Sequence, residues 1–283
     1  MRIHHLNCGT DCPLGGALFD GRSLSPTGTL VCHCLLIETD AHGLVLVDTG
    51  YGLRDVDHPH REPSPRITRF MRNLLNIQLR ESDTAIRQIE ALGFRADDVR
   101  HIVLTHLDFD HAGGLEDFPN ARIHLMDAEF TAATGPRRGV IPRNRYRPSQ
   151  WTDVSDWRRY GANGEKWFGF DTVRDLDGLP PEILLVPLPG HTWGHAGVAI
   201  RRPEGWLLHA GDAYFYRGEM RAALRHCTPG LRGYQTMMDT NRALRMENQD
   251  RLRRLSVDRA AEIKIACAHD PLEFERCRAG RPL

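Results

Sequence analysis

The sequence predicts a layered fold of the α/β or α+β class, in which strands form sheets and helices cover them. Apolar, β-branched runs typical of strands occur in both the first and the last third of the chain. Segments with apolar residues at helical spacing lie between these runs. The chain has 283 residues, 41% of them hydrophobic, which is enough to bury a full core without disulfide or metal cross-links. This mixture is typical of sheets packed against helices.

Eight segments are expected to be strands. The first two, 29–39 and 44–50, are expected to pair as a hairpin, because the intervening sequence Asp-Ala-His-Gly is a typical turn. The remaining six strands are expected at 99–106, 121–126, 182–188, 197–200, 206–212 and 263–270.

Three helices are expected between the strands. Apolar residues at helical spacing predict the first over 67–75. The second is expected to begin at an N-cap on Ser82 and to run through Leu92 to a stop at Gly93. The third is expected as one long helix over about 231–255. Residues 54–66 are polar and rich in proline, so we expect a loop there.

We expect residues 1–283 to form one domain with an aromatic- and arginine-rich insertion at about 131–170. Seven of the chain's 21 aromatic residues lie between Tyr146 and Phe170. Two interpretations stay open. The segment either forms a lid over the substrate, with its arginines meeting a carboxylate or phosphate, or it is a solvated insertion or the contact of a homodimer. The aromatic residues concerned are Trp151, Trp157, Tyr160, Trp167 and Phe168.

Charge and cysteine content exclude several classes of protein. The 37 basic and 37 acidic residues cancel, which argues against a nucleic-acid partner and against a polybasic membrane anchor. No apolar run approaches the ~18 residues of a membrane span, and no signal peptide is evident at the start. Seven scattered cysteines are typical of reduced, inert thiols. We therefore expect a cytoplasmic protein that acts on a small molecule.

The strongest local motif is T-H-L-D-F-D-H-A-G-G, which follows the expected strand 99–106. It places His106, Asp108, Asp110 and His111 within six residues. Residues two apart in an extended segment point the same way, so the first three would line one side of the strand end. Histidine is the commonest metal ligand, and the chain holds 15 of them. This density of donors favours a metal site over a core or a solvated surface.

Three later motifs also place possible ligands at strand ends. They are P-G-H-T-W-G-H with His191 and His195, H-A-G-D-A-Y with Asp212 and Tyr214, and A-H-D-P with His269. Each alone is more often a cap or a hydrogen-bonding group. Together and in this order they are specific.

From about residue 29 to 270 the sequence resembles the metallo-β-lactamase superfamily, and most of all the lactonases that open acyl-homoserine lactones. The resemblance implies an αββα sandwich, with two packed sheets, helices on the outer faces and a two-metal site. It implies that His106 and His191 bind one metal, that Asp110, His111 and His269 bind the other, and that Asp212 bridges both. It also implies that Asp48, in V-D-T-G, supports the metal ligands from beneath, and that His195 hydrogen-bonds without ligating.

Asp108 departs from the family pattern, which usually reads His-x-His-x-Asp-His. A carboxylate still ligates, so we keep Asp108 among the metal ligands. Two divalent ions with Asp110 and Asp212 carry a net charge of about +2, and Asp108 lowers it to about +1, which weakens the Lewis acid. Zinc is the first choice of metal, while the harder oxygen ligand also suits manganese or iron.

The mechanism that the resemblance implies is hydrolysis by a hydroxide held between two metals, which attacks a lactone or ester-like carbonyl. Asp110 is expected to orient that hydroxide and to pass a proton to the leaving alkoxide. Tyr214 is a candidate to assist the carbonyl, with a core or rim tyrosine as the equal alternative. His101, His124 and His209 are expected to be structural, and His58 and His60 to be rim residues or without a role.

Other functions compete with this interpretation. A thioester hydrolase of the glyoxalase II type would normally keep a histidine at position 108. A di-iron redox role lacks a flavin-binding domain, and a nucleic-acid-processing role lacks a basic groove. A binding module with an altered metal site is the non-enzyme alternative, and Asp108 is the residue that supports it.

Overall fold

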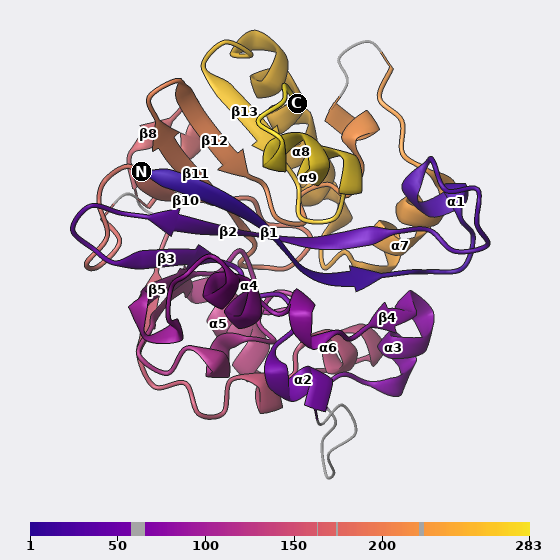
Figure 1. Cartoon of the computed structure of the whole chain (residues 1–283). Coiled ribbons are helices and arrows are strands. Elements are labelled where there is room, and N and C mark those ends of the chain that lie inside the picture. The colour runs from indigo at the N-terminus through magenta and orange to yellow at the C-terminus, as the bar shows by residue number, and fades with distance from the viewer. Residues whose placement is uncertain (58–65, 163, 174, 221–223) are drawn as a thin grey trace.

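The computed structural model describes residues 1–57, 66–162, 164–173, 175–220 and 224–283. Two β-sheets lie face to face, and helices cover their outer faces (Figure 1). This is the α+β sandwich that the resemblance implied, so the predicted fold class is confirmed. His58 and His60, expected at a rim, lie outside the described residues.

The first sheet has seven strands in the order β4-β1-β2-β3-β5-β6-β7. β1, β2 and β3 are antiparallel neighbours, and β3, β5, β6 and β7 run parallel to one another. The hairpin expected between 29–39 and 44–50 is present, with Leu36 opposite Leu46. The strand bounds are β1 Arg2–Asp11, β2 Leu30–Glu38, β3 Leu44–Val47, β4 Ile77–Gln78, β5 Val99–Val103, β6 Arg122–Met126 and β7 Trp157–Tyr160.

The second sheet has four strands in the order β10-β11-β12-β13. All neighbours in it are antiparallel except β12 and β13, which are parallel. A separate two-stranded ribbon is formed by β8 and β9. The bounds are β8 Lys166–Trp167, β9 Phe170–Asp171, β10 Ile183–Pro187, β11 Ala196–Arg202, β12 Gly205–His209 and β13 Ile263–Ala266.

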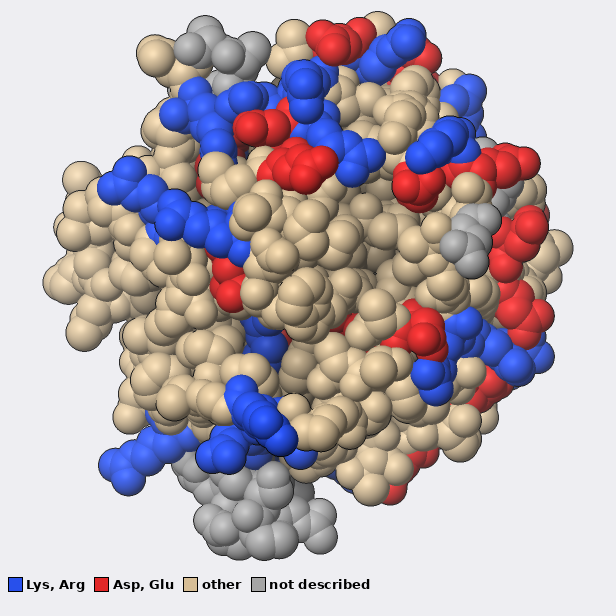
Figure 2. All heavy atoms as spheres, turned by 180° about the vertical axis from the view of Figure 1, so that it is seen from behind, with Lys and Arg blue, Asp and Glu red and all other residues tan. Residues whose placement is uncertain are grey.

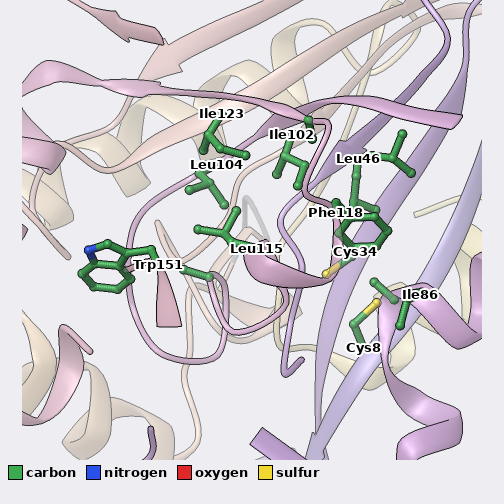
Figure 3. Close-up of a cluster of buried hydrophobic side chains, with 14 of the residues drawn as sticks. Cys8, Cys34, Leu46, Ile86, Ile102, Leu104, Leu115, Phe118, Ile123 and Trp151 are labelled. Atoms are coloured by element: carbon green, nitrogen blue, oxygen red, sulfur yellow. The ribbon is translucent and has the colours of Figure 1, made fainter. Parts of the chain in front are cut away.

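Alternate residues of each strand enter different cores, because successive side chains of a strand point to opposite faces. In β3, Val45 and Val47 pack between the two sheets, whereas Leu46 packs on the outer face of the first sheet. Figure 3 shows this outer core, where Leu46 and Ile102 lie close to Phe118. The equivalent core of the second sheet packs under the long helix α8. Each strand is therefore packed on both of its faces up to the point where the backbone leaves the sheet.

The helices lie at the outside of the sandwich and around one end of it (Figure 1). α4 contributes to the outer core of the first sheet, and α8 to that of the second. The bounds are α1 Ala17–Asp20, α2 Leu53–Asp57, α3 Arg69–Leu75, α4 Ala85–Ala91, α5 Asp127–Thr134, α6 Val140–Arg145, α7 Pro229–Met238, α8 Arg242–Asp258 and α9 Pro271–Arg278. Short 3₁₀ helices cover Glu81–Asp83, Ala96–Asp98, Leu115–Asp117, Pro148–Gln150 and Arg217–Met220. None of the helices in the described ranges is both long and apolar enough to cross a membrane.

Three expectations about helices are corrected. Ser82 is not an N-cap, since it lies inside a 3₁₀ helix and α4 begins after the extended residue Thr84. Residues 53–57 form α2 where a loop was expected. The long helix expected over 231–255 is two helices, and the side chain of Asn241 caps the second by accepting from the amide of Leu244.

The aromatic residues of the 131–170 insertion belong to the cores. Trp151 packs in the outer core of the first sheet (Figure 3), and Trp167 and Phe170 pack in that of the second. Trp151 and Trp167 are therefore core residues and not part of a lid, whereas Trp157, Tyr160 and Phe168 are half-buried against these cores. Figure 2 shows basic and acidic side chains interspersed over one face of the molecule, in keeping with the balanced composition.

Candidate metal centre

The predicted ligands come together from both sheets. His106, Asp108, Asp110 and His111 lie in the loop that follows β5 of the first sheet. The second sheet supplies the remaining three, each just after a strand: His191 follows β10, Asp212 follows β12 and His269 follows β13. All seven side chains are buried. The end of the sandwich therefore concentrates four imidazoles and three carboxylates in one place.

The side chains of His106, Asp108 and His191 surround a common point together with Oδ2 of Asp212. The Nε2 atom of His191 lies 3.1 Å from Oδ2 of Asp108 and 3.3 Å from Oδ2 of Asp212. The Nε2 atom of His106 lies 3.5 Å and 3.6 Å from the same two oxygens. Two imidazole nitrogens and two carboxylate oxygens thus face one another.

A second group surrounds the other oxygen of Asp212. Its Oδ1 lies 3.3 Å from Nε2 of His111 and 3.1 Å from Nε2 of His269. Oδ2 of Asp110 lies 3.9 Å from the first of these nitrogens and 3.7 Å from the second. Nε2 of His269 also lies 3.3 Å from Oδ2, so the carboxylate of Asp212 lies between the two groups and contacts both.

The two groups fit metal ions. Ions bound tetrahedrally by nitrogen and oxygen at ~2.0–2.2 Å keep their ligand atoms about 3.3–3.6 Å apart, close to the separations in each group. Within the described residues, Nε2 of His106, Nε2 of His111 and Oδ1 of Asp212 are buried without a hydrogen-bond partner. Buried polar atoms rarely stay unpaired in a folded protein unless a ligand or water completes them.

In His111 and His269 the ring nitrogen that faces away from the centre is held by the protein. Nδ1 of His111 donates to Oδ2 of Asp48 at 2.8 Å, and Nδ1 of His269 donates to the carbonyl of Val31 at 2.8 Å. Asp48 is itself fixed, because it accepts from the amide and the hydroxyl of Thr105. These contacts leave Nε2 of His111 and of His269 free to ligate, which is how supporting groups fix a metal-binding imidazole.

The other histidines take the structural roles that were expected. His195 bonds through Nδ1 to the carbonyl of Leu188, and its Nε2 accepts from the amide of Asp212 at 2.8 Å. Both its nitrogens are used, so it orients the Asp212 loop rather than ligating. His101 and His124 bond to each other, and His209 bonds to the carbonyl of His33.

Arg145 is a member of the centre that the sequence did not single out. It is 1% exposed, and its Nε lies 3.1 Å from Oδ1 of Asp108. Its side chain comes from α6, inside the insertion whose arginines were expected to meet the substrate. The only signal in the sequence was this run of arginines, which did not distinguish one from another.

The local charges decide which carboxylates stay ionised. Burial would raise the pKa of Asp108, but Arg145 and His106 hold it well below its usual range. Burial opposes ionisation of Asp212 too, yet four histidines, His269 first, hold its pKa well below the usual range. By contrast, burial raises the pKa of Asp110 above its usual value. Asp110 is therefore the carboxylate of the three that most readily holds a proton.

The predicted catalytic role of Tyr214 is not supported by the structure. Its side chain is fully buried in the core of the second sheet, and its hydroxyl donates to Glu273 at 3.0 Å. A hydroxyl committed to an internal carboxyl cannot also meet a substrate.

Its neighbour Phe215 lies at the centre instead, stacked on His269 with ring centroids 4.8 Å apart. Tyr234 of α7 packs edge-on against Phe215 at 5.8 Å. Burial raises the pKa of Tyr234, and the charges of Asp110 and Asp11 raise it further.

Cys32 also lies closer to the centre than its expected inert role implied. Its sulfur and one donor atom each from Asp110 and His269 all lie within 4.8 Å of one another. The thiol is buried on β2, and burial raises its pKa well above the usual value. In this state the sulfur is a protonated neighbour of the second group.

Comparison with known proteins places this geometry in context. Residues 27–261 match the metallo-beta-lactamase superfamily. A probable metallo-hydrolase of Mycobacterium tuberculosis is 40% identical over 279 residues, which span 98% of this chain and 83% of that protein. An N-acyl homoserine lactonase of Bacillus cereus is 33% identical over 206 residues, 69% of this chain and 71% of that protein.

A solved structure extends the comparison to the fold. It is that of an N-acyl homoserine lactone hydrolase with the product N-hexanoyl-L-homoserine bound at its catalytic metal centre. The two chains superpose with a TM-score of 0.69 at 20% identity, over 98% of this chain and 96% of that one. At this identity the likeness concerns the fold alone.

Proposed function

This chain belongs to the metallo-β-lactamase superfamily and is a metallo-hydrolase, and from that premise we propose that it hydrolyses a lactone or ester-like carbonyl at a dinuclear metal centre. The observation that carries the proposal is the position of Asp212 between two groups of donors, with Oδ2 3.3 Å from His191 and Oδ1 3.1 Å from His269. The similarity to N-acyl homoserine lactonases supports a lactone as the substrate class.

The two sets of donors would each hold one divalent ion. His106, Asp108 and His191 would bind the first, and Asp110, His111 and His269 the second, with Asp212 shared between them. When bound, such ions polarise a carbonyl and acidify water. We propose zinc as the resident metal, with manganese or iron as the alternatives that the three carboxylates would also accept.

Asp110 is the residue that we propose moves the proton. It is buried, and its Oδ2 lies in the second group of donors, 3.7 Å from Nε2 of His269. A carboxylate of this kind takes a proton from the attacking water and gives it to the leaving alkoxide. We propose that Tyr234, whose half-buried phenol packs beside Phe215, positions the substrate carbonyl.

Two other functions use the same centre. A thioester hydrolase would need only a different leaving group, and a binding module would need no turnover. A substrate panel of lactones, thioesters and β-lactams, measured with zinc, manganese and iron supplied in turn, separates these functions. Lactone turnover with two equivalents of metal supports the proposal, and turnover of none of these substrates by fully loaded protein contradicts it.

Variants sharpen the test. Asp110→Asn should lower kcat at least 100-fold while the protein still folds. Tyr234→Phe should lower kcat or raise KM. Tyr214→Phe is the matched control and should leave both nearly unchanged, because its hydroxyl faces Glu273. Equal losses in the two tyrosine variants would contradict the role of Tyr234.

We further propose a cytoplasmic protein with a small-molecule substrate. The seven cysteines are all unpaired, which supports a reducing compartment. A homodimer remains a prediction that light scattering on purified protein would test.

A further inference from the structure

Asp108 and Arg145 form a buried ion pair inside the centre. The two side chains are 2% and 1% exposed, and Nε of Arg145 lies 3.1 Å from Oδ1 of Asp108. The backbone sets up this contact, because Asp108 forms an antiparallel β-bridge with Tyr146, the residue next to Arg145. The pair is thus built into the fold on both the main-chain and the side-chain level.

The two oxygens of Asp108 have different neighbours. Oδ1 faces the guanidinium, while Oδ2 faces Nε2 of His191 at 3.1 Å and Nε2 of His106 at 3.5 Å. The charge of Arg145 therefore lies beside one oxygen, while the other oxygen faces the donor group. A carboxylate held this way offers a single, oriented ligand atom, as an imidazole does.

The guanidinium cannot easily turn away. Its Nη1 donates to the carbonyl of His191 at 2.8 Å and to the hydroxyl of Thr240 at 3.2 Å. Its Nη2 donates to the carbonyl of Met238 at 2.8 Å and lies 3.2 Å from Nε2 of His191. Arg145 is fixed by the loop after β10 and by the junction of α7 and α8.

From this geometry we propose that Arg145 and Asp108 act as one unit that replaces a neutral ligand at the first metal position. Arg145 is a positioning residue: it cancels the extra negative charge of Asp108 and fixes which oxygen ligates. With two divalent ions and three carboxylates the centre carries about +1, and the guanidinium returns it to about +2. The inference rests on the proposed metal centre but not on its substrate.

The proposal predicts what a histidine at position 108 would do to the centre. Asp108→His alone would leave Arg145 as an unpaired buried cation beside a cationic centre, which is strongly unfavourable. Removing the arginine at the same time relieves that conflict. The effect of losing Arg145 must therefore have opposite signs in the two backgrounds.

The test measures Co²⁺ binding by chelator competition and by visible absorption, without substrate. The variants are D108H, R145M and the double variant D108H/R145M. We expect D108H to bind the first ion at least tenfold more weakly than the wild type. In the aspartate background we expect R145M to weaken Co²⁺ binding and to alter the Co²⁺ absorption. In the histidine background we expect R145M to raise the affinity for Co²⁺ at least tenfold. Equal effects of R145M in both backgrounds would overturn the proposal.

Two controls separate charge from folding. R145K keeps the cation and must not recover Co²⁺ binding in the D108H background, and recovery by R145K would also overturn the proposal. R143M removes a charge from the exposed side of the same helix and should change nothing in either background. Thermal unfolding of each metal-free variant verifies that it folds. Wild-type protein that binds two Co²⁺ ions and shows this coupling but hydrolyses nothing would refute only the proposed substrate.

Discussion

Nδ1 of His111 lies 2.8 Å from Oδ2 of Asp48, a residue that adopts the left-handed backbone conformation with φ of 54°. A non-glycine residue in this region costs of order 1 kcal/mol, and the structure around Asp48 holds it there. Its carboxylate accepts from His111 and twice from Thr105. The strained residue thus fixes the ring of His111, a candidate metal ligand that comes from another strand end.

Asp48→Asn should weaken metal binding by about 10–100-fold, because loss of a supporting carboxylate releases the imidazole that it orients. Equilibrium dialysis followed by elemental analysis measures the metal retained at fixed free zinc. Asp40→Asn, at the exposed hairpin turn after β2, is the control and should retain the wild-type amount. Unchanged metal content in Asp48→Asn would contradict the assigned role.

Trp151→Ala should destabilise the fold by about 3–5 kcal/mol, the usual cost of truncating a buried aromatic side chain to alanine. Denaturant unfolding measures the change in the free energy of unfolding. Val140→Ala, at an exposed position of the same segment, should change it by less than about 0.5 kcal/mol. A small effect of Trp151→Ala would contradict its assignment to the core.

Glu273 should make the fold less stable as pH rises. Burial, with Asp270 adding to it, raises the pKa of Glu273 from 4.5 to about 8. Above pH 4.5 the unfolded chain loses this proton while the folded protein keeps it, so stability falls until pH reaches about 8.

Glu273→Gln removes that proton equilibrium but keeps an oxygen that can accept from Cys267 and Tyr214. The variant should gain stability over the wild type between pH 5 and pH 8, by up to a few kcal/mol at about 1.4 kcal/mol per pH unit. Urea unfolding of both proteins at several pH values gives the difference. A difference that does not vary with pH would refute the assignment.

Asn241→Ala should destabilise the protein by about 0.5–2 kcal/mol, the cost of losing an N-cap side chain. The cap begins α8 directly after the junction that contacts the loop of His191, where the amide of Asn241 donates to the carbonyl of Gly190. Chemical denaturation again gives the change. Asn120→Ala, in an exposed turn, should have an effect within about 0.5 kcal/mol.

Sequence reasoning located β2, β3, β5, β6, β10, β11, β12 and β13, and the candidate ligands that follow several of them, because both depend on local patterns. It gave no bounds for β1, β4, β7, β8 and β9. The hairpin of β2 and β3 needed only alternation and a turn, and the ligands stood directly after apolar runs. Strand ends can be predicted in this way because the cores on both faces of a strand fix the residue at which the strand stops.

The features that sequence reasoning missed depend on contacts between distant segments. Arg145 reaches Asp108 across 37 positions, and no local pattern distinguishes it from the exposed arginine at 143. The single helix expected over 231–255 breaks because Thr240 donates its amide to Gly190, about 50 residues earlier. Tyr214 looked catalytic only from its place after Asp212, while its direction was set by Glu273.

A bridging Asp212, as proposed above, would tie the stability of the whole sandwich to metal supply. Ligands from the first sheet and from the second meet there, so an ion bound between them is a cross-link between the two layers. In its absence three carboxylates repel one another at the seam. An ion that binds only the folded chain stabilises it by about 4 kcal/mol at a thousandfold excess over its Kd. Chelation should therefore shorten the lifetime of this protein against proteases, and the abundance of the folded protein in a cell should follow the metal available to it.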